Sequence, residues 1–340
     1  MKPIVLKEVT PIDLDAPIVI EEENKKLRDA MYAAECHRRA RYQLMDKIHI
    51  GMSLKEICVT VEDAVRYMLK DEKNNGAGFP VGVSLNDCAA HYSVNPGDED
   101  IFLKEDDILK VDFGTHVDGR IMDSAFTVCF NPKYEPLLMA AKEGTEKGLE
   151  CIGVDVRVCD IGKEIEEVVS SYEVEVDGKM VPVKSVKNLT GHSIEQFKIH
   201  GGVAIPIIDN GDETKLKADM FYACETFVTT GNGVVRDAEN CSHYMLEDSK
   251  RYMVKNANSK KVLQAILKNV GTLPFSPRDI DRYVTVKGGS YPFIKTLASL
   301  RILEAYPPLN DSKGSKVAQF EHTCYLSESS KIILTRGDDY

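Results

Sequence analysis

The sequence lacks any apolar run of the roughly 18 residues that a membrane-spanning helix needs. Two short apolar runs occur in residues 1–20, but three prolines and two aspartates interrupt them, so no secretory signal core is present. The nine cysteines form no CxxC pair, and this scatter is typical of free thiols in a reducing compartment. We therefore expect a cytoplasmic protein without a membrane partner.

An excess of positive charge is also lacking. The chain has 43 Lys and Arg residues against 54 Asp and Glu residues, which gives a formal net charge of −11. Non-specific nucleic-acid binding needs a cationic surface, so this balance argues against a nucleic-acid partner. The content of 43% apolar and 29% charged residues is ordinary for a globular protein and excludes collagen-like, disordered and low-complexity classes.

The hydrophobic pattern repeats one order of elements, helices followed by strands. Four stretches have helical character, the second preceded by Ser53 and the fourth opened by Asp160 as N-caps: 21–48, 54–69, 134–152 and 160–172. Strand-like runs follow each pair of helices: 108–117, 120–130, 173–183, 199–208, 221–229 and 317–326. Residues 72–100 are rich in Gly, Asn and Pro and are expected to be loops. The order predicts two similar halves.

A segment of a different kind lies between His243 and Tyr306. It is helical and basic at first, with Lys250 and Arg251 among its cations, and then turn-rich around residues 274–277. We interpret it as a helical insertion in a sheet-based domain, because no linker separates it from the strands on either side.

Two aspartates are predicted to share one face of a hairpin. Asp118-Gly119 between two apolar runs is a strong signal for a two-residue turn. The resulting register places Asp112 and Asp123 on the same side as diagonal neighbours. Carboxylates so close repel each other unless a cation or a proton lies between them. Each aspartate could instead pair with an arginine or cap a turn, and both interpretations stay open at this point.

Further candidates for the same site are a few polar residues in apolar or loop-rich surroundings. Glu225 and Glu321 lie within apolar strand-like runs, where a charge is costly unless it pairs or coordinates. The histidines concerned are His91, His192 and His200. Four strand carboxylates with one histidine would suit two divalent cations such as Mn, Fe, Co or Zn. Taken singly, each residue also fits an ordinary hydrogen-bonded or solvated role, and no spacing shows that they converge.

Seven separated motifs resemble, in order, those of the type 2 methionine aminopeptidases, which are M24 metallopeptidases. They are residues 86–91, 110–114, 119–126, 191–194, 225–227, 241–243 and 319–323. The likeness runs from about residue 22 to the final residues 336–340.

The resemblance implies an α+β pita-bread fold, in which a curved antiparallel sheet with pseudo-two-fold symmetry is covered by helices. We expect a lead-in at 1–20, a catalytic domain at 21–244 and 307–340, and the type 2 helical insertion at 245–306. The polybasic N-terminal extension of many relatives is absent, so the sequence leaves ribosome association open. We expect a monomer.

The resemblance also implies the site residues. Two divalent cations (Co, Mn, Fe or Zn) would be held by Asp112, Asp123, His192, Glu225 and Glu321. Glu225 would also shuttle a proton, while His91 and His200 would bind the scissile peptide and assist catalysis. The methionine pocket would be lined by Phe79, Ile199, His243 and Tyr306.

The activity implied is that of a hydrolase, an aminopeptidase that removes the initiator methionine from nascent proteins when the second residue is small. Fumagillin-type epoxides, the inhibitors for which this family is known, would alkylate His91. Two alternatives share the fold. An inactive, ribosome- or RNA-binding relative would lack several ligands, and an X-Pro dipeptidase or creatinase-like enzyme would carry an additional domain before the first motif, where only 85 residues stand here.

Overall fold

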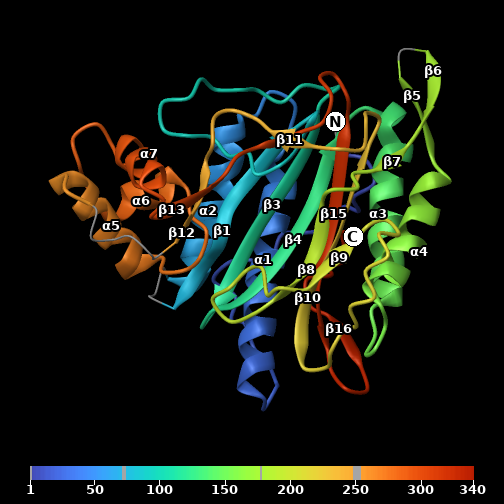
Figure 1. Cartoon of the computed structure of the whole chain (residues 1–340), viewed down its shortest axis with the longest axis horizontal. Coiled ribbons are helices and arrows are strands. Elements are labelled where there is room, and N and C mark those ends of the chain that lie inside the picture. The colour runs from blue at the N-terminus through green and yellow to red at the C-terminus, as the bar shows by residue number, and fades with distance from the viewer. Residues whose placement is uncertain (1, 71–73, 177, 248–253) are drawn as a thin grey trace.

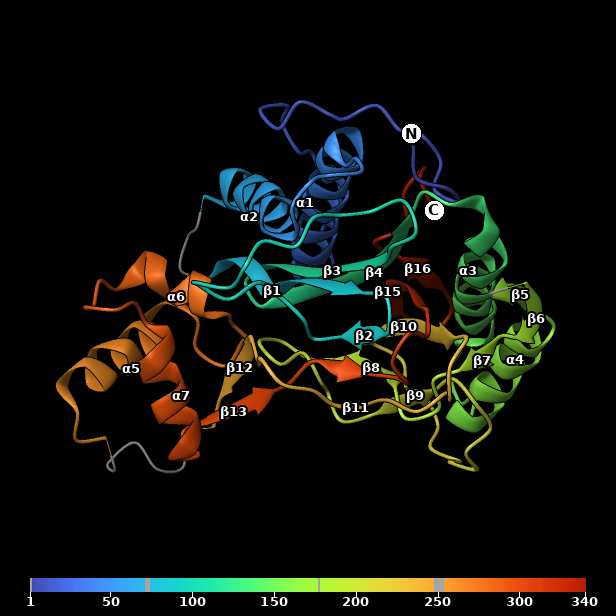
Figure 2. The same cartoon turned by 90° about the horizontal axis from the view of Figure 1, so that it is seen from above.

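The computed structural model describes residues 2–70, 74–176, 178–247 and 254–340. Two groups of antiparallel strands lie side by side at its centre, as Figures 1 and 2 show. Helices α1 and α2 pack on the first group, helix α3 packs on the second, and α4 lies against α3. The helices α5 to α7 form a lobe at the end opposite α3 and α4 (Figure 1). Each group of strands thus has its own helix pair, as the order of elements predicted.

The helices have the bounds α1 Lys25–Lys47, α2 Leu54–Leu69, α3 Glu135–Cys151, α4 Val158–Ser170, α5 Ala257–Asn269, α6 Pro277–Tyr283 and α7 Tyr291–Ser299. The predicted cap of α2 is confirmed, since the Ser53 side chain accepts a hydrogen bond from the Glu56 amide. The predicted cap of α4 is wrong. Its N-cap is Arg157, and the first amides of the helix donate instead to carbonyls of residues 212 and 214, so no capping side chain is required. In the described part of the chain, no helix is long and apolar enough to cross a bilayer.

The strands form two main sheets. The first has the order β1-β3-β4, with bounds Asn75–Leu85, Ile108–Val117 and Arg120–Cys129. The second has the order β16-β15-β10-β8-β9, with bounds Lys331–Ile333, Val317–Leu326, Met220–Thr229, Thr190–Ile194 and Ala204–Pro206, and β7 (Lys184–Ser185) also pairs with β10. Smaller groups are β2 (Cys88–Ala90), β14 (Leu309–Asn310) and β11 (Arg236–Asp237); β12 (His243–Leu246) and β13 (Leu303–Tyr306); and β5 (Glu173–Val176) and β6 (Lys179–Pro182).

Three strand predictions need correction. Residues 72–100 are not mainly loops, because β1 and β2 lie there; residues 72 and 73 are outside the described part. The register of β1 against β3 shifts twice around Phe79, and these bulges accommodate Pro80 and the glycines that suggested a loop. The stretch 173–183 is a hairpin of β5 and β6 around a turn at Gly178. Of 199–208, only β9 is a strand.

The predicted β3–β4 hairpin is confirmed residue by residue. Gly114 is the register partner of Asp123, and Asp112 is the partner of Ala125. The turn residues Asp118 and Gly119 both have positive φ, at 47° and 73°, as a two-residue turn of this kind requires. Asp112 and Asp123 therefore share one face of the hairpin.

Side chains, and not a backbone ladder, join the two main sheets where β4 meets β15. The Thr127 hydroxyl donates to the Gln319 carbonyl and accepts from the Gln319 amide, at 2.7 and 2.8 Å. The Thr323 hydroxyl does the same with Asp123, at 2.7 and 2.9 Å. These paired bonds hold the carboxylates of one sheet next to those of the other.

The lobe formed by α5 to α7 contains an apolar cluster of its own, in which Val262, Ile266, Phe275 and Ile294 are fully buried. The ribbon of β12 and β13 connects this lobe to the rest of the chain. Residues 248–253, which include Lys250 and Arg251 of the basic stretch, lie outside the described residues. The domain boundaries at 20, 244 and 306 stay a prediction.

Candidate metal centre

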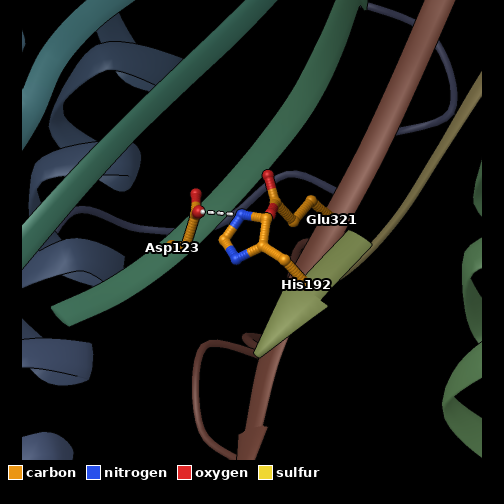
Figure 3. Close-up of side chains that lie close together, drawn as sticks. All are labelled: Asp123, His192 and Glu321. Carbon is orange, nitrogen blue, oxygen red and sulfur yellow. Dashed lines mark ion pairs between the residues drawn. The ribbon is translucent and has the colours of Figure 1, made fainter. Parts of the chain in front are cut away.

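Three side chains from three strands meet beside the seam between the sheets. Asp123 of β4, His192 of β8 and Glu321 of β15 each offer a ligand atom, and these atoms lie within 4.8 Å of one another. Figure 3 shows the carboxylates and the imidazole pointing toward a common point. All three residues are buried, and the His192 Nε2 atom lies 3.5 Å from Asp123 Oδ2.

The protonation state of His192 determines whether its contact with Asp123 can be a hydrogen bond. Its Nδ1 lies 3.2 Å from the Ser193 carbonyl, which can only accept, so Nδ1 carries the hydrogen. Burial lowers the pKa of His192 to about 3, so the ring is neutral near pH 7 and Nε2 has a free lone pair. When Asp123 is ionised, its carboxylate and this lone pair are two acceptors that face each other without a donor. A metal cation between them would satisfy both, and a carbonyl on the second nitrogen is the usual support of a metal-binding histidine.

The other two predicted carboxylates lie on the same surface. Glu225 is the register partner of Glu321 across β10 and β15, and its neighbour Ala223 pairs with His192, two residues along the same face. Asp112 shares the hairpin face with Asp123. The geometry thus brings all five predicted ligand residues together.

Gln319 is the central residue that the sequence interpretation missed. Its side-chain Nε2 lies 3.3 Å from Asp112 Oδ2, 3.1 Å from Glu225 Oε2 and 3.5 Å from Glu321 Oε2, so one amide group donates among three carboxylates. An uncharged glutamine in a strand does not stand out as a ligand candidate. Its position two residues before Glu321, and hence on the same face of β15, is the signal that could have found it.

The electrostatics of the cluster favour a cation. Burial raises the pKa of Asp112 to about 7, and burial together with the neighbouring carboxylates raises the pKa values of Asp123, Glu225 and Glu321 well above their ordinary range. One buried oxygen on each of Asp112, Asp123 and Glu321 has no hydrogen-bond partner among the described residues. No lysine or arginine is among the described residues that line the cavity. Oxygen and imidazole ligands of this number suit divalent metal ions.

A cavity of about 250 Å³ opens over the cluster. All eleven predicted site residues line it, namely Phe79, His91, Asp112, Asp123, His192, Ile199, His200, Glu225, His243, Tyr306 and Glu321. The lining also includes residues that were not predicted, namely Gly82, Ala90, Asn188, Leu189, Thr190, Phe227 and Pro274. Gly114 leaves room for the Phe79 ring, since a Cβ atom at position 114 would lie 2.4 Å from that ring.

Three further histidines surround the cavity. His91 follows β2, and its ring lies 5.9 Å from that of His243 and 6.1 Å from that of Tyr306. Burial lowers the pKa of His91 to about 4 and that of His243 to about 3, so both are neutral near pH 7. The ring of His200 lies edge-on to His192 at 4.6 Å, and desolvation lowers its pKa as well. The cavity therefore offers neutral imidazoles next to a group of carboxylates.

Comparison with known proteins agrees with this site. A model of metallopeptidase family M24 matches residues 29–252, and the chain belongs to this family. Within it, the chain is 58% identical to a protein named methionine aminopeptidase 2 from Encephalitozoon intestinalis. That match covers 92% of this chain and 88% of the relative. The resemblance inferred from the seven motifs is confirmed.

Solved structures show the same fold at low identity. A thermophilic Arx1 superposes with a TM-score of 0.78 at 16% identity, covering 94% of this chain and 92% of the other. A methionine aminopeptidase from Thermotoga maritima superposes with a TM-score of 0.62 at 18% identity, covering 94% and 100%. The pita-bread fold is thereby confirmed. Because that fold is shared by very different sequences, the high identity to the named relative carries the distinction between activities.

Proposed function

We propose that this chain is a metal-dependent aminopeptidase that hydrolyses the peptide bond after an N-terminal methionine. The observation that carries the proposal is one cavity lined by four carboxylates and the His192 imidazole together with apolar and aromatic side chains. The identity to a relative named methionine aminopeptidase 2 supports the same reaction. An enzyme for X-Pro peptides and a binding protein without activity are the alternatives that the experiment below addresses.

Asp112, Asp123, His192, Glu225 and Glu321 would hold two divalent cations, with Co, Mn, Fe and Zn as candidates. The unpartnered oxygens and the neutral His192 support this assignment. When bound, the cations supply a water molecule of lowered pKa and an electrophile for the scissile carbonyl. A substrate's free amino group would be held beside Asp112, which explains why the enzyme acts at an N-terminus.

Glu225 would move the proton in this reaction. Its buried carboxylate lines the cavity, and burial together with Asp112 raises its pKa, which makes it a stronger base than an exposed glutamate. It would take the proton from the attacking water and pass it to the leaving amine. Gln319 donates to Glu225 at 3.1 Å and so fixes its orientation.

His91 and His200 would bind the scissile peptide from the two sides of the cavity. Both histidines line the cavity, and burial lowers the pKa of His91 to about 4, so its imidazole is neutral near pH 7 and has one nitrogen with a free lone pair. We assign one histidine to the oxyanion and the other to the scissile amide. A hydrogen-bond donor beside the oxyanion stabilises the negative charge that develops there during hydrolysis.

The methionine side chain would lie against Phe79, Ile199, His243 and Tyr306. His243 and Tyr306 are register partners on β12 and β13, so their rings form one wall. A thioether packs favourably against aromatic edges. We further propose that the residue after methionine must be small, as the family resemblance implies.

The proposal extends to the setting of the enzyme. None of the nine cysteines forms a disulfide, and this supports our proposal that the enzyme acts in the reducing cytoplasm. We propose a monomer that acts on nascent chains, while ribosome association stays open.

Release of free methionine by metal-stripped protein, with each of the four cations added back, tests the proposal. We expect turnover of Met-Ala-Ser with at least one cation, little turnover of Met-Lys-Ser, and none of N-acetyl-Met-Ala-Ser, which lacks the free amine. Cleavage of Ala-Pro-Ser in place of Met-Ala-Ser would favour the X-Pro alternative. No cleavage of any peptide with any cation would favour a binding protein.

A further inference from the structure

The hydroxyl of Ser242 connects several parts of the pocket wall. Its Oγ lies 3.3 Å from the His91 carbonyl oxygen and 3.1 Å from His243 Nδ1. The same oxygen accepts a hydrogen bond of 2.9 Å from the Ser93 amide. Ser242 is 0% exposed, so bulk water cannot replace these bonds, and loss of the hydroxyl would leave buried polar atoms without a partner.

His91 is a residue that needs such support. Its φ is +63°, in the left-handed region that residues other than glycine rarely adopt and that costs free energy. Surrounding contacts must hold this conformation in place. A relaxation of the backbone here would turn the imidazole away from the cavity, because φ directly sets the direction of the side chain.

Buried polar contacts continue from Ser242 to the helical lobe. Ser93, whose amide binds Ser242, accepts at its own hydroxyl a hydrogen bond of 3.0 Å from Arg278 of α6. Arg278 also forms an ion pair with Glu62 of α2, and the Glu62 side chain is only 3% exposed. The lobe is thus docked on the first half of the molecule through the residues that hold Ser242.

We propose that Ser242 is a positioning residue that orients the His91 and His243 imidazoles toward the cavity, with Ser93 and Arg278 holding it in turn. The inference deepens the proposed function and rests on it, since orientation affects turnover only if these histidines bind the substrate. Ser242 itself is not among the residues that line the cavity, so it would act through the two histidines.

The first test compares Ser242→Ala with Ser259→Ala. Ser259 is an equally buried serine of α5 whose hydroxyl has no partner among the described residues, so its variant controls for loss of one buried oxygen. We expect Ser242→Ala to lower kcat/KM for Met-Ala-Ser by about tenfold, as for loss of one buried hydrogen bond. Cation affinity should be unchanged, and Ser259→Ala should change neither. Ser242→Cys, which keeps a weak donor, should recover part of the loss.

The second test needs no turnover. Diethyl pyrocarbonate acylates unprotonated imidazole, and peptide mapping by mass spectrometry gives the rate at each histidine of the metal-free protein. We expect Ser242→Ala to accelerate the reaction of His91 severalfold, because the backbone carbonyl of His91 is no longer held and its ring is less restrained, while exposed His200 keeps its rate as an internal reference. Unchanged reactivity of His91 in a folded Ser242→Ala protein would overturn the inference. Altered reactivity in a protein that cleaves no peptide would uphold the positioning role and refute the proposed function instead.

Discussion

Glu225 and Glu321 stand directly opposite each other on neighbouring strands, as register partners in the antiparallel pairing of β10 with β15. Both are buried, and like charges in this position destabilise a sheet. The charge of Asp112 raises the pKa of Glu225. The charges of Asp123, Glu225 and Asp112 raise the pKa of Glu321. Cations bound between the carboxylates would offset this repulsion. Variants of the cluster residues can therefore distinguish a role in catalysis from a role in folding.

Glu225→Gln should abolish turnover of Met-Ala-Ser, with a loss of about 10³-fold or more, while the protein stays folded. The amide keeps the shape of the side chain but cannot accept the proton. Methionine release at saturating cation, together with a thermal melt, measures both effects. Near-normal turnover by the folded variant would refute the shuttle role.

Asp112→Asn and Asp123→Asn should each weaken cation binding by at least about 100-fold. The metal-free variants should melt no lower than the metal-free wild type, because removing one carboxylate relieves repulsion in the cluster. Calorimetric titration and thermal melts measure the two quantities. If either variant melts far below wild type without metal, that aspartate has a structural role and the ligand assignment fails for it.

Gln319→Leu should lower the free energy of unfolding of the metal-free protein by about 2 kcal/mol, because Asp112, Glu225 and Glu321 lose a buried donor. Saturating cation should remove much of this deficit. Gln43→Leu, which loses a single exposed bond to the Ile12 carbonyl and does not touch the carboxylate cluster, is a control for cation effects unrelated to the cluster. Equal deficits with and without cation would show that Gln319 does not serve the cluster.

A fumagillin-type spiro-epoxide should inactivate the enzyme by alkylating His91. The free ring nitrogen attacks an epoxide carbon, the C–O bond opens, and the oxygen takes up a proton to become a hydroxyl group. Peptide mapping should find the adduct on His91, and His91→Asn should resist inactivation. An adduct on His200 or on a cysteine would show the assignment to be wrong.

The reactivity of His91 should depend little on pH. Its pKa of about 4 keeps the lone pair free above that value, so the rate with diethyl pyrocarbonate should change by less than about twofold between pH 8 and pH 5. Free N-acetylhistidine in the same solution, with an ordinary pKa near 6.5, should slow about 30-fold over this range. A matching decline for His91 would show that its surroundings do not lower the pKa of its imidazole.

Elements with a strong local signal could be predicted from the sequence. The β3–β4 register followed from Asp118-Gly119, and α2 followed from Ser53 and its apolar period, because both depend on neighbours in the chain. β1 could not be predicted. Its glycines and Pro80 indicate a loop, and only packing against β3 makes the bulged strand stable.

Part of the candidate site could likewise be predicted from local sequence, and part could not. Asp112 and Asp123 converge by local geometry, whereas their meeting with His192, Glu225 and Glu321 depends on how two sheets join across 200 residues of chain. That convergence was available only through the family resemblance. Gln319 and Ser242 lie within two of the recognised motifs, but neither a buried amide nor a buried hydroxyl is costly enough to suggest a function of its own.

The hydroxyl bridges between β4 and β15 also set the moment at which the enzyme can begin to work. Asp112 and Asp123 come early in synthesis, but Glu321 belongs to β15, which is among the last strands to be made. A partly synthesised copy therefore carries an exposed pair of aspartates and no complete centre. If the centre acts as proposed, it is complete only after synthesis has passed β15 and β15 has docked against β4, so cation binding would report that this strand is made and in place.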